Sequence, residues 1–118
     1  MTRVLIADDH KIVRDDLKRI LAGTSDLEVA GEAASGDEAL ALVKSNDYDV
    51  AMLDMSMPGL AGIDLIKRLK LEKPKLRLLV LSMHAEHQYA ARALKAGASG
   101  YILKGSSPRE IIESIHSL

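Results

Sequence analysis

Five short apolar segments, separated by stretches with helical spacing, constrain the fold of this chain more than any other feature. They lie at residues 3–7, 27–33, 49–53, 76–81 and 100–104. Short strands that alternate with helices predict βα units around a parallel sheet. The segments at 49–53 and 76–81 are almost continuously apolar, as expected of central strands covered on both faces. Glu28 and Glu32 interrupt the segment at 27–33, which predicts an edge strand.

The stretches between these segments carry local helix signals. In the first stretch, apolar residues recur on one helical face, and basic residues are expected largely toward solvent. The apolar positions are Val13, Leu17, Ile20 and Leu21, and the basic ones are Lys11, Arg14, Lys18 and Arg19. Two pairs further along have the spacing of a capping box, with Pro108 in the first turn of the second helix; they are Ser35–Glu38 and Ser107–Glu110.

Composition limits the classes of protein that this chain can represent. Its 118 residues, 47% of them apolar, suit one compact domain over residues 1–118, and with 3% aromatic residues the core must be aliphatic. A net charge of −1 gives no field that would hold nucleic acid or a lipid surface. The sequence has no cysteine and no apolar run as long as a signal peptide or a membrane span. We therefore expect a soluble, cytoplasmic protein with no membrane contact.

Polar side chains stand at the ends of the predicted strands. Asp8 and Asp9 follow the first strand, Asp54 the third and Ser82 the fourth, and Lys104 ends the fifth. The carboxyl ends of parallel strands meet at one edge of a sheet, where ligands bind. Three carboxylates, a hydroxyl and an ammonium are therefore expected to converge there.

Such a cluster suits a particular chemistry. Carboxylates that repel one another in a cleft need a cation or raised pKa values. Mg²⁺ fits best, because it takes one or two carboxylates and completes its shell with water and phosphate oxygens. With a Lys and a Ser nearby, this is the equipment for aspartyl phosphorylation, in which Asp54 would be the nucleophile.

Four motifs carry a resemblance to a known family. "IADDH", "LDMSMPG", "LSMHAE" and "GYILK" resemble the motifs of response regulator receiver domains of two-component systems, in the right order and over essentially the whole chain. "ADDH", "LSMH" and "AGASGYILK" are most similar to the NarL/FixJ subgroup, whose receivers usually precede a helix-turn-helix DNA-binding domain. The resemblance implies a flavodoxin-like fold with a five-stranded parallel sheet in the order 2-1-3-4-5 and helices on both faces. Any output domain would lie beyond residue 118.

The resemblance also implies a metal site. Asp9, Asp54 and the backbone carbonyl of Ser56 would ligate Mg²⁺ directly, and Asp8 would act through a bound water. Pro58 and Gly59 would let the loop after Asp54 turn around the metal.

Further residues are implied to handle the phosphoryl group. Asp54 would accept it, Lys104 would pair with its oxygens, and Ser82 would hydrogen-bond them. Tyr101 resembles the switch aromatic that turns inward when Ser82 moves. Two departures from the family pattern are Gly105, where Pro is common, and the bulky Met83, expected to crowd the phosphoryl group's approach. The isomer of the Lys104–Gly105 peptide stays open.

The implied function is a signalling switch rather than a metabolic enzyme. A sensor histidine kinase would supply the phosphoryl group, and the domain would catalyse its own phosphoryl transfer and dephosphorylation. The surface of the fourth helix, fifth strand and fifth helix would carry the change. A homodimer is expected when the protein is phosphorylated, with DNA bound only through an output domain that regulates transcription.

Three other functions compete. An aspartyl phosphatase resembling dehalogenases would need an Asp-x-Asp pattern at the first strand and a cap domain. A flavin or nucleotide carrier would need a Gly-rich loop where this chain has the acidic "DDHKIV". A degenerate receiver that only binds partners would be expected to lack some of the acids. Taken alone, Ser82 and Tyr101 are ordinary strand residues.

The histidines carry no assigned chemistry. His10 is placed where it can line the acidic pocket. His84 and His87 have a spacing that two metal ligands could use, although exposed histidines are the simpler interpretation.

Overall fold

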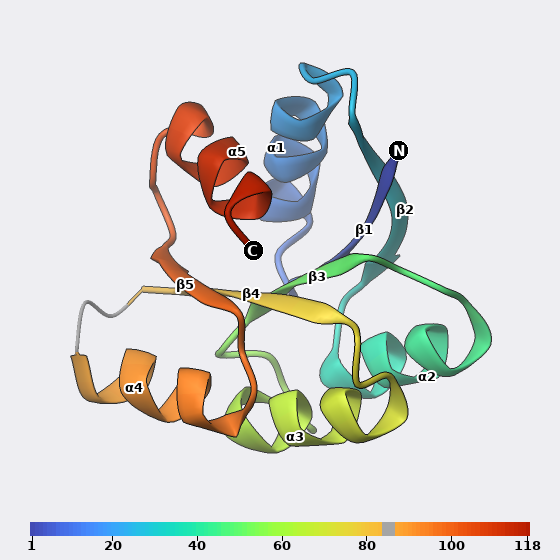
Figure 1. The fold of residues 1–118 in the computed structure, drawn as a ribbon, viewed down its shortest axis with the longest axis vertical. Helices are drawn as coiled ribbons and strands as arrows, with labels where there is room; N and C mark the ends of the chain where they lie inside the picture. Colours follow the sequence, from blue (N-terminus) through green and yellow to red (C-terminus); the bar gives the residue numbers. More distant parts are fainter. Residues whose placement is uncertain (84–86) are drawn as a thin grey trace.

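A computed structural model describes residues 1–83 and 87–118, and within them strands and helices alternate along the chain (Figure 1). The elements are β1 (Thr2–Ala7), α1 (Lys11–Ala22), β2 (Leu27–Ala33), α2 (Gly36–Ser45), β3 (Val50–Asp54), α3 (Gly62–Glu72), β4 (Arg77–Ser82), α4 (His87–Ala96), β5 (Gly100–Leu103) and α5 (Pro108–His116). Of the fourth helix, the side chains of residues 87 and 88 also lie outside the described part. No described helix has both the length and the apolar character that crossing a bilayer needs.

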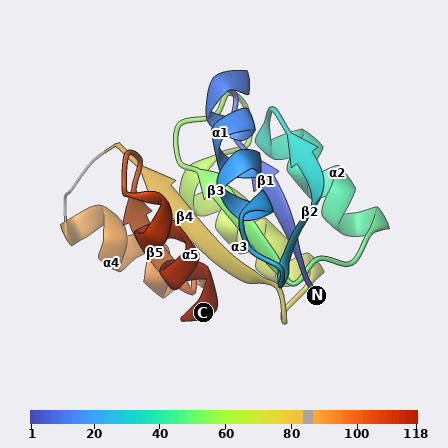
Figure 2. The same cartoon turned by 90° about the horizontal axis from the view of Figure 1, so that it is seen from above.

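The strands form one parallel sheet in the order β2-β1-β3-β4-β5, which confirms the predicted topology. Strand β2 lies at an edge, as Glu28 and Glu32 indicated, and every residue of β3 is buried. Helices α1 and α5 cover one face, and α2, α3 and α4 cover the other (Figure 1). Seen from the side of α1 and α5, the strands run beneath these two helices (Figure 2).

The core is aliphatic and divided by the sheet into two clusters. The cluster toward α2, α3 and α4 includes Leu53, Leu65 and Ile66, all at most 1% exposed. The cluster toward α1 and α5 includes Leu21 and Met52, both fully buried. Because successive strand residues point to opposite faces, adjacent Met52 and Leu53 supply different clusters. This continuous burial explains why the central strands are almost purely apolar.

Capping residues that the sequence predicted mark the starts of two helices. Ser107 and Glu110 form a reciprocal capping box with Pro108 at the start of α5, as the spacing predicted. At α2, Ser35 Oγ accepts a hydrogen bond from the Glu38 N–H at 3.2 Å.

One expectation about α1 is wrong for Arg14, whereas Lys11 and Arg19 are exposed as expected. The basic side of this helix is not uniformly solvated, because the Arg14 side chain is only 15% exposed and pairs with Glu32 of β2. Helical spacing alone could not reveal an acid that arrives from a neighbouring strand.

Candidate functional site

The side chains expected at the strand ends do gather at one edge of the sheet. Asp8 follows β1, Asp54 is the last residue of β3, and Lys104 directly follows β5. One potential ligand atom from each of Asp8, Asp9, His10 and Asp54 lies within 4.8 Å of the other three. Lys104 Nζ lies 2.8 Å from Asp8 Oδ2 and 3.2 Å from Asp54 Oδ1. The prediction that acids and a lysine converge here is confirmed.

The backbone around Asp8 places the acid pair. The Asp8 N–H extends the β1–β2 ladder by donating to the Ala33 carbonyl at 3.0 Å. The chain then turns, and the His10 N–H donates to Asp8 Oδ1 at 2.9 Å before α1 begins. Asp8 is therefore fully buried, whereas the Asp9 side chain remains 29% exposed.

The loop after Asp54 is shaped by glycine. Gly59 and Gly62 have φ values of +73° and +60°, a region that other residues rarely adopt. The Ser56 N–H turns back to donate to Asp54 Oδ1 at 3.1 Å. Across the loop, a Cβ on Gly36 would stand 1.6 Å from the Leu60 carbonyl oxygen, so only glycine permits this approach. The start of α2 thus supports the loop that carries Ser56.

The electrostatics of Asp54 are unusual for a surface edge. Asp54 is 0% exposed, and its Oδ2 accepts no hydrogen bond from any residue that the structure describes. Burial raises the pKa of Asp54, and the negative charge of Asp8 adds to the rise despite the Ser56 N–H and Lys104.

Lys104 compensates for only part of this negative charge. Burial lowers the pKa of Lys104, but the carboxylates of Asp8 and Asp54 outweigh burial and raise the pKa overall. One ammonium therefore faces two buried carboxylates, with a third, Asp9, beside them. The site has room in its charge balance for a further cation.

The donor set fits Mg²⁺. The candidate ligands are hard oxygen atoms from Asp8, Asp9 and Asp54, and Asp54 Oδ2 is a buried acceptor with no donor among the described residues. A buried carboxylate oxygen without a partner costs free energy that a bound cation would offset.

His10 lies at this pocket, as its position in the sequence allowed. Its Nδ1 is 3.2 Å from Asp8 Oδ1 and 3.0 Å from Asp9 Oδ1, although its side chain is 65% exposed. The histidine therefore sits at the rim rather than in the buried part. The second suggested histidine pair cannot be placed, because His84 and the side chain of His87 lie outside the described residues.

The remaining candidate site residues lie on strands β4 and β5 or directly after them. Ser82 is 3% exposed, and its carbonyl accepts from the Lys104 N–H at 2.8 Å, which makes it a neighbour of the lysine. Tyr101 is partly buried and packs against the core cluster on the α4 side. Met83 is 70% exposed. Gly105 has φ +88°, and no peptide bond in the described residues is cis, so the Lys104–Gly105 bond is trans.

Known proteins are similar to this chain in sequence and in fold. The response regulator receiver domain family matches residues 4–116. The response regulator UvrY of Escherichia coli is 36% identical over 118 residues, covering 100% of this chain and 54% of that protein. The chain thus spans about half the length of the curated relatives it matches.

Solved structures of receiver domains have the same fold as this chain. The signal receiver domain of a response regulator, NarL from Mycobacterium tuberculosis, has a TM-score of 0.92 and 36% identity, covering 98% of this chain and 93% of that chain. The isolated receiver domain of RcsB from Salmonella enterica, studied with the phosphomimetic BeF3⁻, has a TM-score of 0.90 and 30% identity, with 98% and 86% covered.

Proposed function

The chain belongs to the response regulator receiver domain family, and on that basis we propose that it is a phosphorylation-dependent switch of a two-component system. A sensor histidine kinase donates the phosphoryl group, and Asp54 accepts it. The observation that carries this proposal is Asp54 itself: it is fully buried at the end of β3, one carboxylate oxygen has no donor among the described residues, and a lysine lies at the other oxygen.

In the transfer step, a carboxylate oxygen of Asp54 forms a bond to phosphorus while the bond from phosphorus to the donor breaks. When the donor is a phosphohistidine, the imidazole nitrogen leaves with the bonding electrons and takes up a proton. Asp54 can serve because β3 holds its carboxylate on a rigid, buried support with one oxygen available.

Lys104 balances the charge that arrives with the phosphoryl group. It already faces the two buried carboxylates, so it needs little movement to pair with a phosphoryl oxygen. Asp9, Asp54 and the Ser56 carbonyl would hold Mg²⁺, with Asp8 acting through a water. When bound, this ion supplies charge neutralisation at the phosphoryl oxygens.

The output of the switch is a shift between two conformations. We infer that Ser82 hydrogen-bonds the phosphoryl group and that Tyr101 follows it inward, which alters the surface of α4, β5 and α5. The domain over residues 1–118 also speeds its own dephosphorylation. In the intact protein, we expect this change to favour a homodimer and to regulate transcription in the cytoplasm through a DNA-binding domain outside this chain.

Intact mass tests the proposal. The protein is incubated with acetyl phosphate and with a phosphorylated histidine kinase, each with and without Mg²⁺. We expect one added phosphoryl group in the wild type with metal, none in Asp54→Asn, and normal labelling in Asp47→Asn, which alters a side chain 94% exposed. If the wild type stays unmodified with both donors, the domain is not a phosphorylation switch, and a module that only binds partners becomes the better interpretation.

A further inference from the structure

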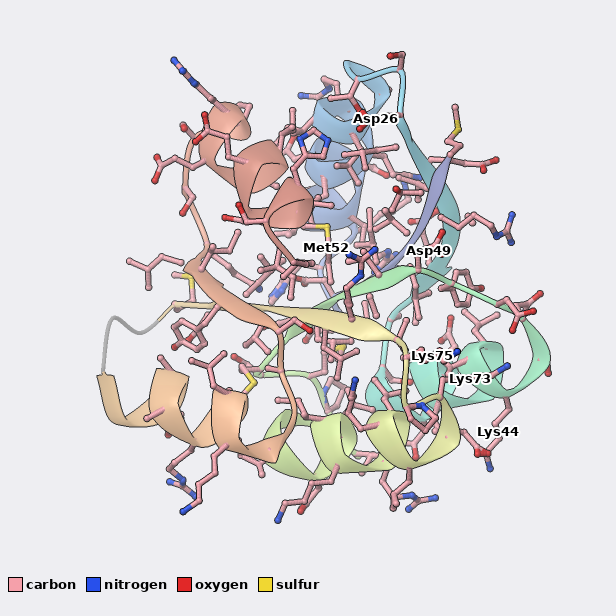
Figure 3. The ribbon with its side chains drawn as sticks, viewed as in Figure 1. Asp26, Lys44, Asp49, Met52, Lys73 and Lys75 are labelled. Atoms are coloured by element: carbon pink, nitrogen blue, oxygen red, sulfur yellow. The ribbon has the colours of Figure 1, made fainter. Side chains whose placement is uncertain are left out.

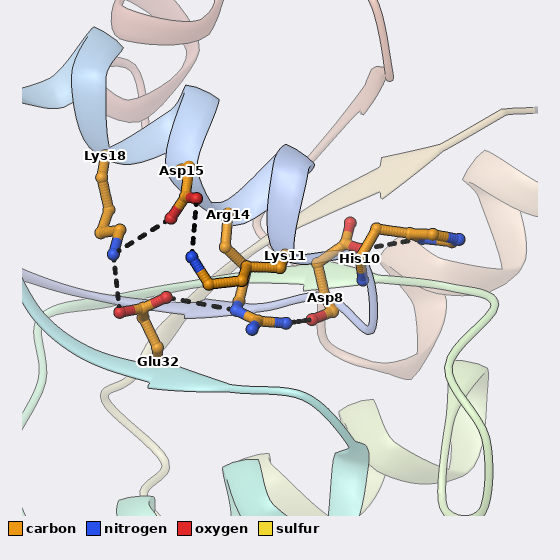
Figure 4. A network of polar contacts seen from close by, with 7 residues as sticks. All are labelled: Asp8, His10, Lys11, Arg14, Asp15, Lys18 and Glu32. Atoms are coloured by element: carbon orange, nitrogen blue, oxygen red, sulfur yellow. Dashed lines mark hydrogen bonds and ion pairs between the residues drawn. The ribbon is translucent and has the colours of Figure 1, made fainter.

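Arg14 connects α1 to the backbone of the acid pair. It lies on α1, where its guanidinium is mostly covered, with 15% of the side chain exposed. Its Nη1 donates to the Asp8 carbonyl at 2.7 Å, and its Nε donates to Glu32 Oε1 at 3.2 Å (Figure 4). One planar guanidinium thus bridges a backbone oxygen at the site and an acid on the edge strand.

The oxygen that accepts from Arg14, the Asp8 carbonyl, lies between the two acids of the pair. The Asp8 carbonyl belongs to the rigid peptide plane that joins Asp8 to Asp9. Rotating this plane changes ψ of Asp8 and φ of Asp9, and therefore the relative direction of the two carboxylates. Because Asp8 is fully buried, its carbonyl needs a donor, and Arg14 provides one.

The arginine is itself held by a charged network. Lys18 Nζ lies 2.9 Å from Glu32 Oε2 and 3.3 Å from Asp15 Oδ1 (Figure 4). Glu32 is therefore paired with Lys18 at one carboxylate oxygen and with Arg14 at the other. The Lys18 ammonium, aided by Arg14, lowers the pKa of Glu32 and keeps that carboxylate charged. Glu32 precedes Ala33, whose carbonyl accepts from the Asp8 N–H. Both peptide groups of Asp8 are therefore tied to the end of β2, one directly and one through Arg14.

We propose that Arg14 is a positioning residue for the acidic pocket, fixing the Asp8–Asp9 peptide plane and with it the geometry that the carboxylates offer to Mg²⁺. Glu32 and Lys18 keep the guanidinium in place. This inference rests on the proposed function, since it assigns Arg14 a part in the same site. Mg²⁺ makes the geometry matter, because it demands near-octahedral ligands at short distances.

The sign of the effect separates positioning from simple charge. If Arg14 acted only as a nearby positive charge, its removal would strengthen the binding of a cation to the acids. If Arg14 positions the acids, its removal weakens Mg²⁺ binding despite the lost repulsion. Partners that orient metal ligands typically change metal affinity by about 10- to 100-fold.

The first experiment measures Mg²⁺ affinity by isothermal titration calorimetry. We expect Arg14→Ala to bind Mg²⁺ about tenfold more weakly than the wild type. The matched control is Arg19→Ala, which removes the same charge from the same helix at a side chain 77% exposed. Arg14→Lys keeps the charge but lacks the planar guanidinium fork that reaches the Asp8 carbonyl and Glu32 together, so it should also weaken binding by a few fold. Unchanged or tighter binding in both Arg14 variants would overturn the proposal.

The second readout needs neither metal nor phosphodonor. In the metal-free protein, the amide hydrogens of Asp8 and His10 should exchange about tenfold faster in Arg14→Ala or Arg14→Lys than in the wild type. The Asp49 amide, which donates to the Arg3 carbonyl far from the pocket, is the internal control. Equal exchange at Asp8 and His10 in all variants would contradict the positioning role. A wild type that binds no Mg²⁺ and accepts no phosphoryl group would instead count against the proposed function.

Discussion

The acids at the amino ends of the strands differ from those at the carboxyl ends in burial and in partners. We call these two ends of the sheet the amino edge and the carboxyl edge. At the amino edge, Asp47 and Asp49 are exposed and well partnered: Lys73 Nζ lies 2.9 Å from Asp47 Oδ1, and the Arg3 N–H donates to Asp49 Oδ2 at 2.7 Å. Figure 3 shows Asp49, Lys73 and Lys75 at this end. At the carboxyl edge, Asp8 and Asp54 are fully buried and share a single lysine, Lys104.

The pKa values follow the same division. The Lys73 ammonium lowers the pKa of Asp47, whereas burial, followed by the charge of Asp8, raises the pKa of Asp54. The folded state therefore favours the charged form of Asp47 at the amino edge and opposes the charged form of Asp54 at the carboxyl edge. A buried carboxylate that reduces stability, such as Asp54, indicates a functional site.

The largest effect should come from removing the buried cation. Lys104→Met would remove the ammonium that faces the buried carboxylates of Asp8 and Asp54, and we expect a loss of about 3 kcal/mol in the free energy of unfolding. Lys73→Met at the amino edge removes a cation from an exposed pair and should cost much less, because solvent screens this pair. Urea unfolding measures both. Equal losses would erase the contrast between the edges.

Asp54→Asn should have the opposite sign. Replacing the buried carboxylate by an amide of the same shape relieves its repulsion with Asp8 while Lys104 keeps one partner, so stability should rise by about 1 to 2 kcal/mol. Urea unfolding without Mg²⁺ is the measurement. A destabilised variant would show that the Asp54 carboxylate is well accommodated after all.

At the amino edge, removing an acid should destabilise. Asp49→Ala deletes the acceptor of the Arg3 N–H, and we expect a loss of about 0.5 to 1 kcal/mol. The same unfolding assay applies. A gain in stability here would mean that exposure and partnering do not distinguish the two edges.

The smallest effects should appear in the pH dependence. Asp54 has a raised pKa, so the native state holds its proton more strongly than the unfolded chain. Stability from this group falls as pH rises from about 4 toward the raised pKa, and the advantage of Asp54→Asn should grow over that range.

Asp47 should behave in reverse. Its lowered pKa contributes stability above the pKa of the unfolded chain, so any deficit of Asp47→Asn should shrink as pH falls below about 4. Thermal unfolding at a series of pH values compares both variants with the wild type. Parallel curves for the two variants would refute the opposite pKa shifts.

The sequence predicted the fold and the members of the carboxyl edge because both depend on short-range patterns. Apolar segments located the strands within one residue of every boundary, and the acids that follow them had to meet in a parallel sheet. The capping box at Ser107 likewise depends on neighbours in the chain.

Other features depend on distances that no local pattern contains. The bond from Arg14 to the Asp8 carbonyl requires α1 to pack beside β2, and the contact of Gly36 with Leu60 joins two loops. The partial burial of Asp9 beside the full burial of Asp8 follows from the turn before α1, which adjacent letters in the sequence do not distinguish.

The thermal stability of the protein as Mg²⁺ is added tests whether the carboxyl edge binds a cation. A cation that binds the native carboxyl edge must raise the melting temperature by mass action. We expect Mg²⁺ to raise the melting temperature of the wild type and of Asp47→Asn equally, and to have little effect on Asp54→Asn. If Mg²⁺ stabilises all three proteins alike, or none of them, the carboxyl edge is not the cation site.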